Sequence, residues 1–446
     1  MFDESEDECD NALCEELLKK NKAMKEERQE IIKEFAEELV ALFRNVTTTE
    51  ENRFLEFFGE KKENVKLLVQ EFAPFKRNQA IYALNNFIKS NCKKTVLENY
   101  DGDKIPPIYE SIEIKRKDFQ MMIAVGYYFF EWKNVKFIID LYFQGTARFY
   151  RIWFRNEDEK TAIELQKALT DYLKDCNFLK GEKLLFLAQG NTEFLEYPNL
   201  NWNDVILSED IKEEFCLNII FPLENEKSCK DGGVPWRRGL MLGGKAGTGK
   251  TQVCRVLCNE LPKGVTVIWA TPKAIYNETQ IQLLFEAARF FNPSLIIIED
   301  IDFIGLDRSI SQNPILGELL TQLDGNDPND GIFVIATTNR PEMLDEALAN
   351  RPSRFDVQLL FELPNPEQRT KIIALFTKKM EFAEELNMSQ IISNTDGLSG
   401  SHIKEIFVHC QLKALKEKRK VSTKDIIDKA IKYCKSLKKS GKDMVR

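Results

Sequence analysis

Residues 244–251 read Gly-Lys-Ala-Gly-Thr-Gly-Lys-Thr and match the pattern Gly-x-x-x-x-Gly-Lys-Thr. The apolar Leu240-Met241-Leu242 precedes the match and an apolar-periodic segment follows it, which predicts strand, loop and helix. Glycines let backbone N–H groups turn toward a β-phosphate, and the helix N-terminus adds partial positive charge. The pattern therefore predicts a phosphate loop, in which Lys250 pairs with β- and γ-phosphate oxygens and Thr251 ligates Mg²⁺.

Two adjacent carboxylates lie about fifty residues further on, where Leu295-Ile296-Ile297-Ile298 runs into Glu299-Asp300-Ile301-Asp302. An uninterrupted apolar run of this length is typical of a buried parallel strand, and carboxylates at its carboxyl end emerge beside the phosphate loop. One carboxylate can hold hydrated Mg²⁺ and the next can polarise the attacking water. We assign the first role to Glu299 and the second to Asp300. The expected cofactors are ATP and Mg²⁺. The expected nucleotide contacts in the loop are Gly244, Lys245, Ala246, Gly247, Thr248, Gly249, Lys250, Thr251 and Gln252.

The composition is that of a large globular protein. The chain has 446 residues, 43% hydrophobic and 30% charged, which is enough material for two or three domains. Its formal net charge of −8 provides no general excess of positive charge for nucleic acid. The longest apolar stretch, Met121 to Phe130, is too short to span a membrane. Ten cysteines without a Cys-x-x-Cys pair, and an N-terminus without a secretory signal, indicate the cytoplasm.

The N-terminal part divides into three expected regions. Residues 1–20 are acidic and read as a flexible tail, and residues 21–100 contain apolar residues at helical spacing, including the segment Val65–Phe72. After the turn-forming segment Asp101–Pro107, aromatic and β-branched runs predict antiparallel hairpins, followed by an amphipathic helix through Leu173. We therefore expect a helical region at 21–100 and a small α+β domain at 101–198. Neither carries a constellation of chemically active residues.

The block from about Asn201 to Lys435 resembles an AAA-type ATPase module. The resemblance implies a fold of class α/β, with a P-loop parallel-sheet core at 199–363 and a C-terminal helical lid with a basic tail at 364–446. Asp204 and Val205 resemble the segment that contacts adenine in this family. The segment Val334–Pro341 resembles the family's second region of homology, so Asn339 is expected to position the lytic water.

The family places arginine fingers in a segment similar to Asn350–Asp356, which makes Arg351 and Arg354 the candidates. Such an arginine stabilises charge on the transferred phosphoryl group and comes from a neighbouring subunit, so the resemblance implies a homo-oligomer, expected as a hexamer. Gly397-Leu398-Ser399-Gly400 resembles the signature of the lid, and His402 stands where the family commonly has an acidic residue. We interpret His402 as a hydrogen-bonded lid residue rather than a ligand.

The sequence also departs from the family pattern. The usual Asp-Glu pair is reversed to Glu299-Asp300, as in the branch that includes the mitochondrial Rieske-protein translocase, which predicts slower turnover. The region expected at a central pore, Ala270–Asn277, has Tyr276 but no aromatic-hydrophobic-Gly motif.

Two functions are compatible with these residues. The first is an ATP-hydrolysing ring that remodels protein substrates selected through residues 1–198. The alternative is a slow, nucleotide-gated scaffold that threads no substrate. A third option, nucleic-acid binding through the basic C-terminal helix, is weaker because no sequence-specific binding motif is visible.

Overall fold

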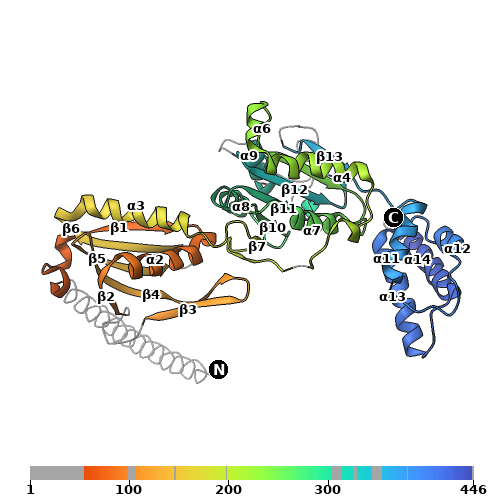
Figure 1. Cartoon of the computed structure of the whole chain (residues 1–446), viewed down its shortest axis with the longest axis horizontal. Coiled ribbons are helices and arrows are strands. Elements are labelled where there is room, and N and C mark those ends of the chain that lie inside the picture. Colours follow the sequence, from red (N-terminus) through yellow and green to blue (C-terminus); the bar gives the residue numbers. More distant parts are fainter. Residues whose placement is uncertain are drawn as a thin grey trace, which may run out of the picture. The chain divides into compact units, whose positions relative to one another are not determined.

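The computed structural model describes residues 55–98, 107–144, 147–196, 198–303, 314–324, 329–343, 354–378 and 380–443. The chain divides into two compact units (Figure 1). The first holds most residues up to Cys176, and the second holds Asn177 onward together with the short segments Ala73–Gln79 and Glu113–Asp118.

The first unit is built on a six-stranded sheet with the order β1-β6-β5-β4-β2, and β3 pairs with β4. The pairs β1·β6, β5·β6, β4·β5 and β2·β4 are antiparallel. Of these, β4·β5 and β5·β6 join consecutive strands and confirm hairpins that the sequence predicts. Lys133 and Asn134 both have positive φ, as the tight turn between β4 and β5 requires. The elements are β1 (Val65–Phe72), α2 (Arg77–Asn91), β2 (Lys93–Glu98), β3 (Ile108–Lys115), β4 (Asp118–Trp132), β5 (Val135–Gln144), β6 (Ala147–Arg155) and α3 (Glu159–Asp175).

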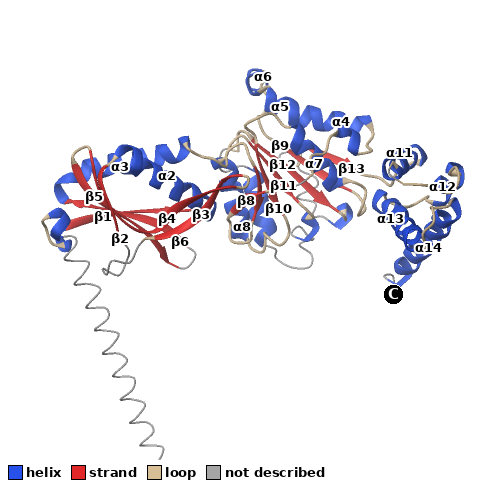
Figure 2. Cartoon of the chain, turned by 60° about the horizontal axis from the view of Figure 1, so that its bottom comes forward, coloured by secondary structure: helices blue, strands red, loops and turns tan. Residues whose placement is uncertain are grey.

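Helices α2 and α3 cover one face of this sheet (Figure 2). Leu84 and Phe87 of α2 and Leu165 and Leu169 of α3 share a core with the strands, and burying this apolar surface stabilises the unit. The amphipathic helix that the sequence predicts through Leu173 is therefore confirmed as α3. The opposite face carries a smaller cluster around Trp153.

The helix predicted over Val65–Phe72 is wrong, because this segment is strand β1, paired with β6 from Val65↔Arg155 to Phe72↔Arg148. Val65, Leu68, Val69 and Phe72 fit the helical spacing, but short apolar runs are ambiguous between helix and strand. Pairing with β6 runs along all eight residues and supplies ladder hydrogen bonds on that side of the strand, and this tertiary interaction overrides the local pattern. The described part of region 21–100 is consequently mixed, with β1 and β2 in the same sheet as β3–β6.

The second unit is built on a seven-stranded sheet with the order β13-β9-β12-β11-β10-β7-β8. All neighbouring pairs are parallel except β7·β8. Strands β7 and β8 precede residue 198, so this sheet begins earlier than the expected core at 199. The strands are β7 (Lys183–Phe186), β8 (Thr192–Phe194), β9 (Arg238–Gly243), β10 (Thr266–Ala270), β11 (Ser294–Ile298), β12 (Ile332–Thr338) and β13 (Val357–Leu360).

Helices cover both faces of the parallel sheet, as an all-apolar strand such as β11 requires (Figure 2). Helices α8 and α9 contribute Phe285 and Leu319 to the core of one face, and α4 and α7 contribute Phe215 and Val253 to the other. These helices are α4 (Glu209–Phe215), continued by a π-helix (Cys216–Ile220) and α5 (Phe221–Glu224), then α6 (Glu226–Asp231), α7 (Lys250–Glu260), α8 (Glu278–Phe290) and α9 (Pro314–Asp324).

Four helices follow the last strand and form a separate apolar core around Phe407. They are α11 (Pro366–Thr377), α12 (Met388–Asn394), α13 (Gly400–Lys416) and α14 (Thr423–Asp443). The predicted order, a parallel-sheet core followed by a helical lid, is confirmed. None of the helices in the described part of the chain combines the length and hydropathy that crossing a membrane requires.

Candidate functional site

The phosphate loop connects β9 to α7, as predicted. Gly244, Gly247 and Gly249 have φ values of 147°, 78° and 109°. A side chain is strained in this region of φ, so the loop shape depends on glycine. At Gly244 the space is also closed, because a Cβ would lie 2.3 Å from the Phe361 carbonyl oxygen.

Lys250, the first residue of α7, is 5% exposed. Its ammonium group donates to the carbonyl oxygens of Gly244 (2.5 Å) and Lys245 (3.1 Å) and to Oδ1 of Asn339 (3.0 Å). Burial lowers the pKa of Lys250, and the nearby Asp300 and Asp302 oppose that shift. The charge therefore sits inside the curve of the loop, held by oxygen atoms that phosphate oxygens could replace.

Asn339 connects this lysine to a carboxylate. Its Nδ2 donates to Oδ1 of Asp300 over 2.8 Å, and its backbone N–H donates to Oδ1 of Asp302 over 3.3 Å. The backbone N–H of Asp300 donates to the Thr337 hydroxyl, and Asp300 has a φ of 47°, which is uncommon for a residue with a side chain. The carboxyl ends of β9, β11 and β12 thus join Lys250, Asp300 and Asn339 in one hydrogen-bonded chain.

The pKa of Asp300 is raised from its ordinary value. Burial is the largest cause, and the carboxylates of Asp302 and Glu299 add to it, while Lys250 and the hydrogen bond from Asn339 act in the opposite direction. Asp302 is buried and belongs to this cluster, although the sequence analysis gave it no role. A half-buried acid that accepts a hydrogen bond from an amide, which in turn contacts a cation, can accept a proton from water.

A cavity of about 660 Å³ opens over these residues. Of the predicted site residues, those that line it are Asp204, Val205, Ala246, Gly247, Thr248, Gly249, Lys250, Thr251, Gln252, Asp300 and Asn339. Gly244, Lys245 and Glu299 do not line it, although the carbonyl groups of the first two contact Lys250. The remaining lining residues, which the sequence analysis did not assign to the site, are Leu200, Ile206, Ile372, Leu375, Phe376, Gly400, Ser401 and Lys404.

The lid closes one side of this cavity. The backbone N–H of Ser401 donates to the carbonyl oxygen of Gly247 over 3.2 Å. His402 Nδ1 lies 3.0 Å from the Ser399 hydroxyl at the start of α13, so the interpretation of His402 as a hydrogen-bonded lid residue is confirmed. With Val205 and Ile206 on one side and Ile372 and Phe376 on the other, the cavity has polar groups at the loop and apolar walls beyond it, as a nucleotide requires.

The residues present fit a nucleotide-bound Mg²⁺. Within the described segments, no group of three His, Cys, Asp or Glu side chains is arranged to hold a metal by itself. Mg²⁺ in phosphate-transfer sites needs only one or two protein oxygens besides phosphates and waters. Thr251 would supply one such oxygen at the cavity wall, and half-buried Glu299 follows β11 at the same carboxyl end of the parallel sheet, two strands from β9.

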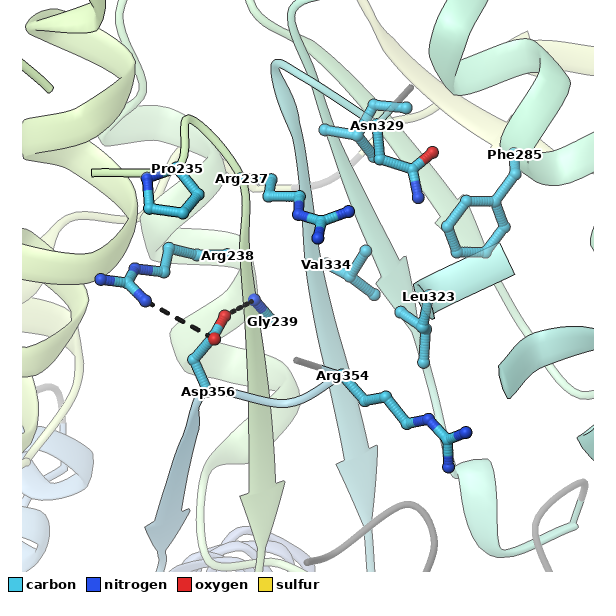
Figure 3. A pocket seen from close by; sticks show the side chains of 11 residues that line it. Pro235, Arg237, Arg238, Gly239, Phe285, Leu323, Asn329, Val334, Arg354 and Asp356 are labelled. Atoms are coloured by element: carbon cyan, nitrogen blue, oxygen red, sulfur yellow. Dashed lines mark hydrogen bonds and ion pairs between the residues drawn. The ribbon is translucent and has the colours of Figure 1, made fainter. Parts of the chain in front are cut away.

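The two arginine-finger candidates have different outcomes. Arg351 lies outside the described residues. Arg354 is buried beside the start of β9, where its backbone carbonyl oxygen would lie 2.1 Å from a Cβ on Gly239. Its guanidinium group makes a two-pronged ion pair with Asp324, with Nε–Oδ1 at 2.7 Å and Nη2–Oδ2 at 2.8 Å. Figure 3 shows Arg354 in a second pocket, and it does not line the phosphate-loop cavity.

These features define a P-loop nucleotide-binding protein with a helical lid. Residues 240–363 match the family model described as ATPase family associated with various cellular activities (AAA). A Methanocaldococcus jannaschii protein described as a 26S proteasome regulatory subunit homolog is 31% identical over 280 residues, covering 60% of this chain and 73% of that protein. The chain belongs to the AAA family, binds nucleotide and hydrolyses ATP.

Other similar proteins share a smaller part of their length with this chain. The proteasome-activating nucleotidase of Methanopyrus kandleri is 32% identical over 53% of this chain and 56% of its own length. The ATP-dependent zinc metalloprotease FtsH of Mycoplasma mobile is 30% identical over 53% of this chain and 34% of its own length. The chain therefore spans about half the length of the first of these relatives and about a third of the second.

Proposed function

We propose that this ATPase works as a ring, expected as a hexamer, and that it remodels protein substrates. The observation that carries the proposal is the position of Arg354. Strand β9 has six residues between this arginine and the phosphate loop, a rise of about 20 Å at 3.3 Å per residue. An arginine finger at Arg354 therefore cannot serve the nucleotide of its own chain, and a second copy must supply that nucleotide.

The proposed chemistry is the in-line attack of water on the γ-phosphate. Lys250 neutralises charge on the phosphate oxygens, Asp300 accepts the proton of the water, and Asn339 orients that water. Thr251 and Glu299 would hold Mg²⁺, which neutralises developing charge when bound. Asp204 and Val205 would contact adenine at the apolar end of the cavity.

Arg351 and Arg354 would act on the nucleotide of a neighbouring subunit. In this proposal the ion pair between Arg354 and Asp324 exchanges for contacts with the phosphoryl group when two subunits meet. An arginine acting in this way is worth roughly 10³–10⁵ in rate in related nucleotide hydrolases. Turnover per subunit would consequently depend on assembly.

The first unit is the part of the chain that would select a protein substrate. The names of the curated relatives include proteasome-activating proteins and a protease, which supports action on polypeptides. Tyr276 is 58% exposed between the buried Ile275 and α8, and could grip a polypeptide in a central pore.

A nucleotide-gated scaffold is the second candidate. The observation in its favour is that Ala274 and Ile275, next to Tyr276, are buried in the core. The exposed residues of segment Ala270–Asn277 are Lys273 and Tyr276, so Tyr276 has no second exposed apolar residue beside it. The hydroxyl of Tyr276 also accepts a hydrogen bond from Gln280 over 3.3 Å. Tyr276→Ala should abolish substrate-stimulated ATP hydrolysis in a threading ring, and it should change little in a scaffold.

Two substitutions test the assigned chemistry. Lys250→Ala should abolish nucleotide binding or turnover, because it removes the cation enclosed by the loop. Asp300→Asn keeps the shape of the side chain and should preserve ATP binding while stopping hydrolysis. Unchanged turnover in Asp300→Asn would remove the assignment of this residue as the base.

A further inference from the structure

A second pocket lies at the amino ends of the inner strands β9 and β12, and the phosphate loop follows the opposite, carboxyl end of β9. Its volume is about 200 Å³, several times the roughly 30 Å³ that a water molecule takes in the liquid. We call it the arginine pocket. Its lining residues include Arg237, Arg238 and Arg354, and Phe285, Leu323 and Val334 form its apolar part (Figure 3).

Two of the three guanidinium groups are neutralised by carboxylates. Arg354 pairs with Asp324, and Arg238 lies 3.5 Å from Oδ1 of Asp356. Asp356 is also fixed by the backbone N–H of Gly239, which donates to its Oδ2 over 2.9 Å. Among the described residues, Asp324 and Asp356 are therefore already engaged by these two arginines.

Arg237 differs from these two arginines. It is half-buried, and within the described part of the chain it has no hydrogen bond or ion pair. Figure 3 shows its side chain extending into the pocket toward Val334, whereas Arg238 turns to Asp356. A guanidinium group beside an apolar wall is incompletely hydrated, so an oxyanion that entered would meet a cation at low local dielectric.

The occupant cannot be a phosphate on the chain's own phosphate loop. Arg237 precedes β9 and the loop follows it, so the length of the strand, about 20 Å, separates the two. An oxyanion in the arginine pocket must come from another molecule. Because Arg237 and Arg354 line the same pocket, a second copy that brings its nucleotide to Arg354 brings it to Arg237 as well.

We propose that Arg237 contacts the terminal phosphoryl group of a nucleotide bound to a second copy of this chain. The inference rests on the proposed ring, and it adds to the two arginine candidates a residue that needs no ion pair to be broken. Arg237 transfers no proton and forms no covalent bond. Its planar guanidinium group donates two hydrogen bonds to phosphoryl oxygens while water attacks phosphorus and the bond to ADP breaks.

The test is a subunit-mixing experiment with the full-length chain. Arg237→Ala retains an intact phosphate loop, and Lys250→Ala retains an intact Arg237. Each alone should hydrolyse ATP slowly, with Arg237→Ala lowered by roughly 10- to 100-fold at saturating protein, as expected for losing a hydrogen bond to a charged group. In a mixture, Arg237 of one subunit meets an intact phosphate loop of the other, so the rate should exceed the sum of the separate rates.

Two further variants control this experiment. Arg237→Lys keeps the charge and loses the two-pronged geometry, so its rate should lie between those of wild type and Arg237→Ala. Arg255→Ala removes a half-buried arginine of α7 that lines neither pocket, and it should hydrolyse ATP within about two-fold of wild type. Sedimentation of every variant establishes that assembly is retained.

Three results would overturn the inference. One is a wild-type rate for Arg237→Ala. Another is a loss of rate that mixing does not restore, since this would assign Arg237 a role within its own subunit. The third result would assign the pocket to free phosphate instead of the nucleotide of a second copy. In it, calorimetric titration of dilute Lys250→Ala with inorganic phosphate shows binding, the binding is lost when Arg237→Ala is added, and mixing the two single variants gives no rescue. If the wild-type rate per subunit does not depend on protein concentration, the proposed ring fails independently of Arg237.

Discussion

Gly247 of the phosphate loop is in contact with the lid, so Gly247→Ala perturbs two features at once. A Cβ at this position would lie 1.8 Å from Oγ and 2.9 Å from Cβ of Ser401, and 2.8 Å from Oγ of Ser399. Its φ of 78° also belongs to the region that residues with a side chain rarely adopt. We expect the substitution to weaken nucleotide binding through both effects.

The two contributions can be separated. The left-handed conformation costs a residue with a side chain about 1–2 kcal/mol, which corresponds to about a 5- to 30-fold loss of affinity at 1.4 kcal/mol per tenfold. The overlap with Ser401 adds to this, because ordinary carbon contacts are about 3.5 Å and the lid must move away by more than about 1 Å. Adding Ser401→Gly removes both overlaps with Ser401 and leaves the close approach to Ser399 Oγ together with the cost of the backbone conformation.

Calorimetric titration with ADP measures these effects without turnover. Gly247→Ala should bind ADP more than about 30-fold more weakly than wild type, and Gly247→Ala/Ser401→Gly should recover part of the loss, to about 5- to 30-fold. Ser401→Gly alone is the matched control and should remain near wild type. Wild-type affinity in Gly247→Ala, or a double variant weaker than the single, would refute the close contact between the loop and the lid.

Two further predictions concern Asp300, the carboxylate proposed as the base, and the first unit. Asp300 must be ionised to accept a proton, so its raised pKa places the acidic limb of the kcat–pH profile above that of an ordinary aspartate. Asn339→Ala removes a hydrogen bond that lowers this pKa, so the limb should move to higher pH; an unmoved limb in the pH–rate profile would contradict the assignment. In the first unit, Arg151 pairs with the fully buried Asp140, so Arg151→Ala should lower the free energy of unfolding by about 3–5 kcal/mol. Chemical denaturation monitored on the first unit should show this loss, and only a small change for Lys133→Ala, which breaks an exposed ion pair.

The phosphate loop and the carboxylates could be predicted because their chemistry depends on short, contiguous segments. The loop from Gly244 to Thr251 requires glycine at the positions where φ is positive. The apolar run before Glu299 is typical of a strand that is buried on both faces, which is what β11 is. Asp302 was harder to assign. Its contact with the backbone of Asn339 links residues far apart in the sequence, and only the pairing of β11 with β12 brings them together.

The parts that could not be predicted depend on tertiary pairing. Val65–Phe72 satisfies a helical and an extended pattern equally, and the partner strand β6, almost eighty residues later, decides between them. Strand β7 joins the parallel sheet through β10, although its four residues carry no signal that distinguishes them from a local hairpin. The lid contributes Phe376 and Ser401 to the cavity from separate helices. That Arg237 has no ion pair among the described residues is likewise visible only once Asp324 and Asp356 are seen to pair with Arg354 and Arg238.

The central claim is that the active site is completed between subunits. Steady-state ATP hydrolysis per subunit, measured across a wide range of protein concentration with Lys250→Ala as the contamination control, tests it most directly. The account predicts a specific rate that rises with concentration and then saturates, because Arg354 and Arg237 lie about 20 Å from the phosphate loop of their own chain. A rate that is the same at all concentrations would contradict it.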